Sequence, residues 1–569
     1  MTEHFDAIIV GSGFGGSVSA LRLAEAGLRV CLLERGKAYP PGSFPRSPRD
    51  VGANFWDPSG GCQGLFDIWS FRDMEAVVSS GLGGGSLIYA NVLLRKDEKW
   101  FVREETGKEA YEYWPVSRVE LDPFYDRAEQ VLRPQRYPLD QPPYSATTKT
   151  LALKEAAERL GLEWFLPHLA VTFANDGNPA VPGELIKETY PNLHGRQRST
   201  CRLCGECDLG CNYGSKNTLD YNYLSLAKLA GADLRPRSEV KSFAPKLGGG
   251  YTVNYVRHEP EDEGRPTDTH ALPRHEITAD RLILSAGTLG STYLLLKNRA
   301  SFPGLSPTLG TRFCGNGDLI AFAMHALQEE GKAATPRRIN PSHGPVITST
   351  IRVPDAADGG KGRGFYLQDA GYPEFISWML EATQASALVQ RMGRFLEERL
   401  LTWTGRSPQT EVGQEMTRLL GPCTLSSSSM PLLGMGRDRP DGVFTLRSAA
   451  HSPEPFLDLD WHDVKSRPYY QEIITTARQV AKAMGAVYDE NPMTHIHRFI
   501  TAHPLGGCPM GRSADEGVVD SFGEVFGYPG FVIADGSVLP GPVGANPSFT
   551  IAALAERFAD HLVQKGPSP

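Results

Sequence analysis

The chain lacks the features that define several large classes of protein. Its 569 residues contain no internal repeat, and no apolar run approaches the roughly 20 residues that a membrane-spanning helix needs. The net charge is −8 and no basic stripe is present, so nucleic acid is not expected as a partner and membrane contact is expected to be peripheral at most. An apolar run that starts at residue 6 leaves no room for a cleavable signal peptide, which favours a cytoplasmic location. A chain of this length is too long for one compact core, so we expect two or more domains.

The opening of the chain reads as a strand, a glycine turn and a helix. Asp6–Val10 is suited to a buried parallel strand, and a Gly-x-Gly-x-x-Gly pattern follows it directly. Such glycines permit a tight turn, close approach of the backbone to a pyrophosphate, and close packing of the next helix. Glu34 ends the next apolar run, about 20 residues further on, where a carboxylate can accept hydrogen bonds from ribose hydroxyls. The pattern predicts an adenine-dinucleotide site at Gly11, Gly13, Phe14, Gly15, Gly16, Glu34 and Arg35; the alternative is a glycine-rich turn in an ordinary parallel sheet.

Several later segments have recognisable patterns as well. Residues 239–258 predict a hairpin that turns at 248–250. Residues 281–286 predict a second buried strand, which is followed by a helix over 289–296. The nucleotide site is therefore expected to draw on both ends and the middle of the chain. Further helices are predicted over 151–160, 374–401 and 466–485, and from about Pro547.

Four separated blocks of sequence resemble the glucose–methanol–choline (GMC) family of FAD-dependent oxidoreductases, and its cholesterol-oxidase-like members most of all. They occur in the family's order and span nearly the whole chain, which makes the resemblance far more specific than the glycine turn alone. The blocks are DAIIVGSGFGGS at 6–17, GLGGGSLIYAN at 81–91, RLILSAGTLGSTYLLLK at 281–297, and the C-terminal pair TAHPLGGCPMG at 501–511 and GFVIADGSVLPGPVGANPSFTIAALAER at 530–557.

The resemblance implies FAD rather than NAD as the cofactor. It also implies an α/β fold, in which a Rossmann-like FAD-binding domain carries an inserted α+β substrate domain built on an antiparallel sheet. The predicted FAD-binding domain is discontinuous and comprises residues 1–120, 195–314 and 498–569. The predicted substrate-binding domain and crossover segments comprise residues 121–194 and 315–497.

The family's cofactor contacts map onto further residues of this chain. A second glycine-rich stretch, Gly83, Gly84, Gly85 and Ser86, is suited to lie against the flavin or the pyrophosphate; a flexible loop is the alternative. The better-known cholesterol oxidases have an asparagine three residues after that serine, whereas this chain has Tyr89 there and Asn91 two residues later, so either residue can face the ring. The remaining contacts implied by the resemblance are Val240, Ala286, Gly287, Asp535, Gly536, Asn546 and Pro547.

His503 and Asn546 are the candidate catalytic pair. Alcohol oxidation removes a hydroxyl proton while a hydride leaves the carbon, so the site needs a proton acceptor near neutral pKa and a polar group that holds the oxygen. Histidine suits the first task and asparagine the second. In the family, the matching histidine and asparagine face the reactive edge of the flavin. The alternative is that His503 satisfies backbone groups and Asn546 caps a helix.

Sterol oxidases of this kind also isomerise their product with a glutamate on a strand of the substrate domain. The stretch FYLQDAGYP at 365–373 matches that strand and places Gln368 at the glutamate position, where an amide cannot act as a base. Asp369 is adjacent, but neighbouring side chains of a strand point to opposite faces. We therefore expect no isomerase activity, and we interpret Asp369 as a surface carboxylate.

Four of the nine cysteines fall in one short segment, CRLCGECDLGC, as Cys201, Cys204, Cys207 and Cys211. Their C-x₂-C-x₂-C-x₃-C spacing is that of a four-iron ferredoxin run, although the proline after the last cysteine is missing. Structural zinc usually uses two C-x₂-C pairs with a longer gap. A 4Fe–4S cluster and reduced or partly paired structural thiols are the two main interpretations, with zinc as a third.

The sequence thus predicts an FAD-dependent enzyme that oxidises a sterol or another bulky apolar secondary alcohol. Oxygen or another electron acceptor would reoxidise the flavin, and an iron–sulfur cluster would favour a dehydrogenase. Two alternatives stay open: a non-redox lyase of the same fold with a structural FAD, and an electron-transfer flavoprotein that uses the cluster.

Overall fold

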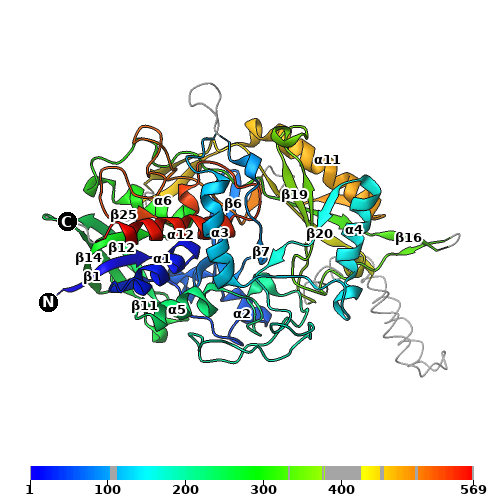
Figure 1. Ribbon diagram of the computed structural model, residues 1–569, viewed down its shortest axis with the longest axis horizontal. Helices are drawn as coiled ribbons and strands as arrows, with labels where there is room; N and C mark the ends of the chain where they lie inside the picture. Colours follow the sequence, from blue (N-terminus) through cyan, green and yellow to red (C-terminus); the bar gives the residue numbers. More distant parts are fainter. Residues whose placement is uncertain are drawn as a thin grey trace, which may run out of the picture.

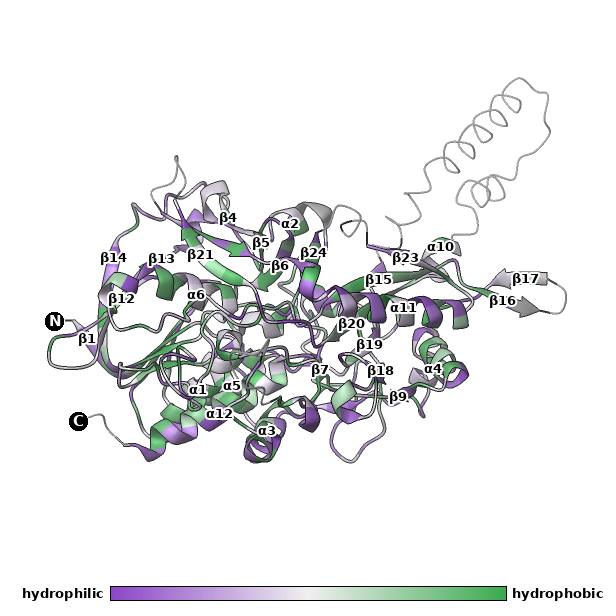
Figure 2. Cartoon of the chain, turned by 90° about the horizontal axis from the view of Figure 1, so that it is seen from above, coloured by the Kyte–Doolittle hydropathy of each residue, from purple (hydrophilic) through white to green (hydrophobic). Residues whose placement is uncertain are grey.

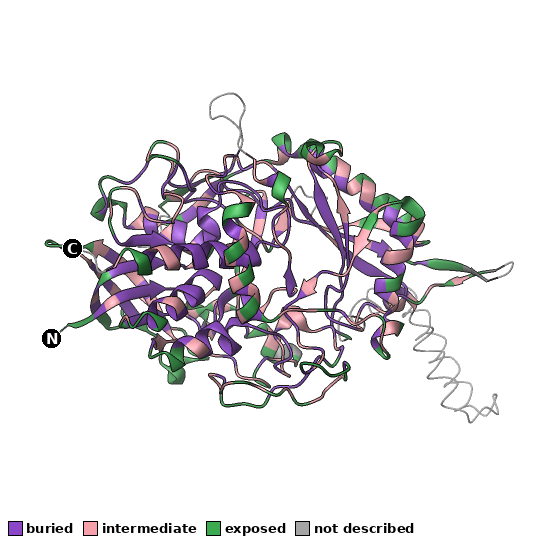
Figure 3. Ribbon diagram, in the orientation of Figure 1, coloured by how far each residue is buried: buried purple, intermediate pink, exposed green. Residues whose placement is uncertain are grey.

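Two β-sheets organise the molecule, and the computed structural model places them side by side along its long axis (Figure 1). The structure describes residues 2–102, 112–330, 333–374, 377, 424–448, 454–491, 493 and 498–566. Both termini lie at the end that holds the first sheet, and the strands of both sheets are largely buried (Figure 3). No helix among the described residues is both long enough and apolar enough to cross a membrane.

The first sheet has seven strands in the order β11-β2-β1-β14-β13-β12, with β25 paired to β14. Its parallel part joins the first strand to strands from the middle and the end of the chain, and β12 and β13 add the predicted hairpin. β14 is long enough to pair with β13 along its first half and with β25 along its second. The strands are β1 (Glu3–Val10), β2 (Val30–Leu33), β11 (Asp233–Arg235), β12 (Ser238–Pro245), β13 (Tyr251–Arg257), β14 (Arg274–Leu284) and β25 (Phe531–Ile533).

Apolar helices cover this sheet. In Figure 2, hydrophobic residues run along α1, α5 and α12, and α1 contacts the other two. The predicted strand–glycine–helix units at the start of the chain and over 281–296 are present, and the last helix begins at Ser548, one residue after the predicted start. The helices are α1 (Phe14–Glu25), α3 (Arg118–Leu132), α5 (Tyr223–Leu229), α6 (Gly287–Lys297) and α12 (Ser548–Gln564).

The second sheet is antiparallel throughout and has the order β23-β15-β20-β19-β18-β9. The predicted helices at 151–160 and 466–485 are α4 (Thr148–Leu160), which has Gly161 as its C-cap, and α11 (Arg467–Ala483); the two helices contact each other. The expected fold class is therefore confirmed, while the exact domain limits stay a prediction. The strands are β9 (Glu163–Phe165), β15 (Leu319–Met324), β18 (Thr350–Val353), β19 (Phe365–Asp369), β20 (Met430–Gly436) and β23 (Val487–Glu490).

Smaller elements connect the two sheets. The predicted helix over 374–401 lies outside the described residues, apart from 374 and 377. Strand β24 leads directly to His503 and pairs with β6 in a three-stranded sheet. The other elements are α2 (Pro48–Gly52), α10 (Thr424–Ser427), β3 (Trp56–Asp57), β4 (Cys62–Gln63), β5 (Phe66–Ser70), β6 (Met74–Ser79), β7 (Val92–Leu93), β8 (Gln135–Arg136), β10 (His168–Leu169), β16 (Leu327–Glu330), β17 (Ala333–Pro336), β21 (Val443–Arg447), β22 (Phe456–Asp460) and β24 (Phe499–Thr501).

The start of α1 packs backbone to backbone against the ends of β14 and β25. A Cβ atom on Gly15 would lie 1.3 Å from the carbonyl oxygen of Ala534. Gly11 has φ +95°, and a Cβ there would lie 2.3 Å from the carbonyl oxygen of Ser285. Gly16 similarly faces the carbonyl oxygen of Gly11 at 2.0 Å. Only glycine allows these approaches, so the turn and the two strand ends form one unit.

We expect Gly15→Ala to destabilise the protein by roughly 3 kcal/mol or more, because the added methyl group collides with backbone that cannot move alone. Gly13→Ala is the matched control, because a Cβ there would meet no protein atom within 4 Å; its cost should stay below about 1 kcal/mol. Denaturant unfolding of the two apoproteins measures both values. Equal losses would contradict the packing described here.

Candidate active site

Two glycine-rich loops touch and open onto a common space. A Cβ on Gly84 would lie 2.6 Å from the Cα of Gly13, and the amide of Gly83 donates to Ser12 Oγ at 2.9 Å. By contrast, a Cβ on Gly13 or on Gly85 would meet no atom within 4 Å. The two loops therefore leave room at their junction, and backbone amides beside the start of α1 suit a pyrophosphate.

Glu34 ends β2 beside this junction. Its carboxylate accepts from the amide and hydroxyl of Ser12 at 3.0 and 2.7 Å and from the amide of Gly36 at 2.8 Å, and burial raises its pKa. The carboxylate therefore holds the glycine turn by hydrogen bonds. Glu34 is also the residue predicted to bind the ribose. Arg35 pairs with Asp67 at 2.6 Å. Val240 is buried in β12, whose first amide donates to the carbonyl of Glu34.

Asn91 and Tyr89 differ sharply in their surroundings. Asn91 is fully buried with φ +70°, and neither atom of its amide has a partner among the described residues. Tyr89 already donates to the carbonyl of Asn217 at 3.4 Å and packs edge-on against Phe14. Because a buried amide without partners is costly, Asn91 fits a position that contacts a bound polar group such as the flavin. The glycine junction, Glu34 and Asn91 therefore fit FAD.

Asp535 joins the C-terminal block to the start of α6. Its carboxylate accepts from the amide of Gly287 at 3.0 Å and from the amide of Ser537 at 2.9 Å, and burial raises its pKa. The following Gly536 accepts from the amide of Gly506 at 3.0 Å. The segment just after His503 is therefore held against the predicted flavin contacts Ala286, Gly287, Asp535 and Gly536.

His503 is held by a carboxylate that the sequence did not reveal. Its Nδ1 lies 2.8 Å from Asp318 Oδ1, and Asp318 Oδ2 accepts from the hydroxyl of Thr501 and the amide of Ala502, both at 2.9 Å. A carboxylate against Nδ1 favours the tautomer with the hydrogen on that nitrogen, which leaves Nε2 available as a proton acceptor. His503 is half-buried.

Asn546 is buried directly before α12, and Gln368 fixes its amide. Gln368 Nε2 donates to Asn546 Oδ1 at 3.0 Å, so the Nδ2 group of Asn546 is left to donate elsewhere. Gln368 Oε1 is buried and has no partner among the described residues. Pro547 occupies the N-cap position of α12 and fixes the entry into that helix. Asn546 is therefore oriented as a donor by a residue from the second sheet.

The expectation for Asp369 is wrong in one respect. As predicted, its side chain and that of Gln368 point to opposite faces of β19. Asp369 is not on the surface, however: it is 0% exposed, and its carboxylate accepts from the amides of Thr348 and Ser349 at 3.0 and 2.7 Å. Neither partner lies near it in sequence, which is why no local pattern could show its burial.

The cysteine segment does not support the metal prediction. Among the described residues, no group of three or more His, Cys, Asp or Glu side chains is placed to hold a metal ion, so neither a zinc site nor an iron–sulfur site is supported. Cys201, Cys204, Cys207 and Cys211 are free thiols that line a pocket of about 20 Å³. Burial raises the pKa of Cys204 to about 12 and also raises that of Cys201, which keeps these thiols protonated at neutral pH.

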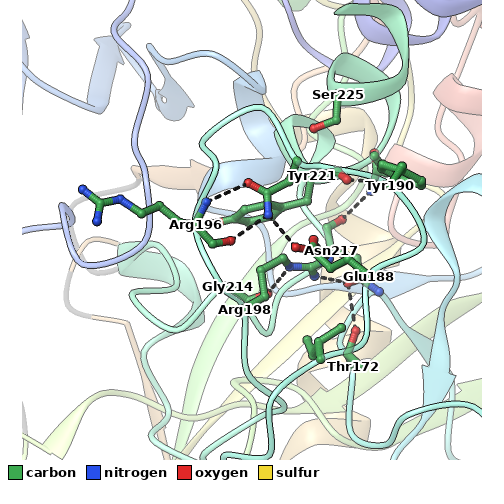
Figure 4. A network of polar contacts seen from close by, with 12 residues as sticks. Thr172, Glu188, Tyr190, Arg196, Arg198, Gly214, Asn217, Tyr221 and Ser225 are labelled. Atoms are coloured by element: carbon green, nitrogen blue, oxygen red, sulfur yellow. Dashed lines mark hydrogen bonds and ion pairs between the residues drawn. The ribbon is translucent and has the colours of Figure 1, made fainter. Parts of the chain in front are cut away.

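A larger cavity, of about 910 Å³, lies between the end of α3 and the segment 172–190, and its lining includes neither His503 nor Asn546. Figure 4 shows the polar network in its wall, in which Arg198 donates to Gly214 and Asn217. Because this guanidinium is already bonded to the protein, we assign the network a structural role.

Comparison with known proteins agrees with this geometry. Residues 438–555 match the family model described as GMC oxidoreductase, and residues 6–39 match the FAD binding domain. Cholesterol oxidase of Mycobacterium tuberculosis (strain CDC 1551 / Oshkosh) is 30% identical over 591 aligned positions that cover 100% of this chain and 92% of that protein. Cholesterol oxidase of Acinetobacter baumannii is 28% identical, covering 99% and 95%. Pyridoxine 4-oxidase from Mesorbium loti shares the fold, with a TM-score of 0.55 at 17% identity and 98% coverage of each chain.

Because space is left beside Gly13, the variant Gly13→Ala also tests FAD binding. We expect this variant to fold but to bind FAD roughly tenfold more weakly or worse, about 1.4 kcal/mol, because the methyl group enters the space left for the pyrophosphate. Flavin absorbance per protein, titrated with FAD after its removal, measures the change. Gly52→Ala is the control, since a Cβ at this exposed glycine also meets nothing within 4 Å. Wild-type FAD affinity in Gly13→Ala would contradict the assignment.

Proposed function

Because the chain belongs to the GMC oxidoreductase family and is an FAD-dependent alcohol oxidoreductase, we propose that its substrate is a sterol or another bulky apolar secondary alcohol and that His503 is the base. The two cholesterol oxidases at 28% and 30% identity over nearly the full chain support the substrate class. One turn, 315–318, directly before β15, binds both His503 and the backbone just before Asn546; this supports the catalytic assignment and is the observation that carries it.

In each residue of the pair, one polar atom of the side chain is bound by the protein and the other is left to interact with the substrate. With Nδ1 of His503 held by Asp318, Nε2 accepts the proton when the O–H bond of the alcohol breaks. With Oδ1 of Asn546 occupied by Gln368, Nδ2 donates to the alcohol oxygen, which becomes the ketone oxygen. FAD, when bound, would supply the two-electron acceptor for the hydride that leaves the carbinol carbon. Gly13, Gly84 and Asn91 would hold it.

Gln368 also bears on the fate of the ketone once it has formed. Moving a double bond into conjugation needs a base, and an amide cannot accept and return the proton. Asp369, the neighbouring carboxylate, is bound on the opposite face of β19. We propose that the reaction ends at the unconjugated ketone. Product analysis with cholesterol tests this point, because a conjugated enone formed at the rate of oxidation would contradict it.

His503→Ala tests the proposal. We expect the rate of flavin reduction by cholesterol under anaerobic conditions to fall by about 10²–10⁴, because the proton acceptor is lost, while FAD stays bound. His462→Ala is the matched control: that imidazole also lies against a carboxylate, with Nδ1 2.6 Å from Asp73, but it is 52% exposed. Wild-type flavin reduction in His503→Ala, or an equal loss in both variants, would refute the role of His503.

A further inference from the structure

We propose that Asp318 is the positioning residue of His503, and that the 315–318 turn carrying it also positions Asn546. This inference rests on the proposed function and adds the group that sets the protonation and orientation of the base. The turn closes with a hydrogen bond from the amide of Asp318 to the carbonyl of Gly315 at 3.2 Å. It lies immediately before β15, so it is fixed to the second sheet.

Both carboxylate oxygens of Asp318 are engaged in polar contacts with the protein. Oδ1 faces His503 Nδ1, while Oδ2 holds the hydroxyl of Thr501 and the amide of Ala502. The same hydroxyl of Thr501 accepts from the amide of His503 at 2.9 Å. The carboxylate therefore cannot rotate without losing three bonds to the segment that carries the base, and the imidazole is fixed in direction as well as in tautomer. Asp318 is only 9% exposed, so water competes little for these contacts.

The other titratable groups around the turn do not replace this charge. Asp438 accepts from the amide of Gly315 at 3.0 Å, and burial raises its pKa to about 7. Tyr469 donates to the carbonyl of Gly317 at 2.7 Å. Burial raises the pKa of Tyr469, and that of Tyr470 and Cys314 as well, so these groups are neutral at pH 7. The positive charge of Arg363 opposes the rise in the pKa of both Asp438 and Tyr469. Of these groups, only Asp318 contacts the imidazole.

Asn316 gives the turn its second anchor. Its Oδ1 accepts from the amide of Gly544 and its Nδ2 donates to the carbonyl of Ala545, both at 2.9 Å, which fixes the backbone just before Asn546. Asn316 and Gly317 have φ +54° and +65°, the conformation of a type I′ turn that Asn-Gly favours. The base and the oxygen-holding amide are therefore aligned through one rigid turn, although they lie 43 positions apart in the sequence.

The charge of Asp318 also favours the proton transfer itself. When His503 accepts the hydroxyl proton it becomes positive, and an adjacent carboxylate stabilises that form. Asp318 touches neither the substrate nor the reacting atoms, so its contribution acts through His503. A purely structural carboxylate would support the fold without influencing the protonation of the base.

Asp318→Asn separates these two roles. We expect kcat with cholesterol to fall by roughly 10- to 10³-fold, with the FAD content unchanged. The acidic limb of the kcat/KM profile should move to lower pH, because an adjacent carboxylate favours the positive form of an imidazole. Asp369→Asn is the matched control, another buried aspartate whose partners lie on the opposite face of β19; its pH profile should match that of the wild type.

Asn316→Gly tests the second anchor, because glycine keeps the positive φ but removes both bonds to the 544–545 backbone. We expect a lower kcat/KM with the acidic limb unmoved.

An acidic limb unmoved in Asp318→Asn would overturn the proposal. If that variant fails to fold, Thr501→Ala provides the test: it keeps the charge but removes one of the two hydrogen bonds to Oδ2 and the acceptor of the His503 amide, so kcat should fall about 3- to 10-fold, and a wild-type kcat would overturn the inference. Wild-type turnover in His503→Ala would instead refute the proposed function, whatever Asp318 does.

Discussion

The close approach of the first turn of α1 to the ends of β14 and β25 is the constraint on which the rest of the structure depends. Gly11 and Gly15 touch the backbones of Ser285 and Ala534, so segments from the beginning, middle and end of the chain must meet at one point. The chain continues from Ala534 through Asp535 to the loop before α12, so the same meeting point fixes where the segment that leads to Asn546 begins. The predicted cofactor contacts and the proposed catalytic residue Asn546 thus belong to one continuous segment.

The loop before Asn546 is held from a second side by a buried charge. Lys96 Nζ donates to the carbonyls of Pro542 and Val543 at 2.8 and 3.2 Å, opposite the bonds from Asn316. Burial lowers the pKa of Lys96 to about 7, and the carboxylate of Glu112 favours its charged form. Although burial opposes the ionisation of Glu112, Arg437 and Arg363 lower its pKa to about 2. A buried ionic cluster therefore fixes the loop before Asn546, which has little regular structure of its own.

Local patterns predicted the elements that a short stretch of sequence determines. The glycine turn, the hairpin and α12 follow from spacing, and the family resemblance pointed to His503 and Asn546. Asp318 could not be found in this way, because it meets His503 across 185 positions, although Asn316-Gly317 is itself a recognisable turn signal. Asp369 was misjudged because its partners, Thr348 and Ser349, lie on another segment. For the cysteines, spacing left an iron–sulfur cluster, structural thiols and zinc open, and the described residues support no metal site.

The two sheets contribute different groups to the proposed site. His503 and Asn546 come from segments attached to the nucleotide-binding side, but the groups that orient them, Asp318 and Gln368, precede or lie on strands of the second sheet. The orientation of the pair therefore depends on the antiparallel sheet that we propose also forms the substrate pocket. On this proposal, a change in that sheet that alters specificity also alters, through β15 and β19, the proposed base and the proposed oxygen-holding amide. Substrate choice and reaction rate would then be physically coupled.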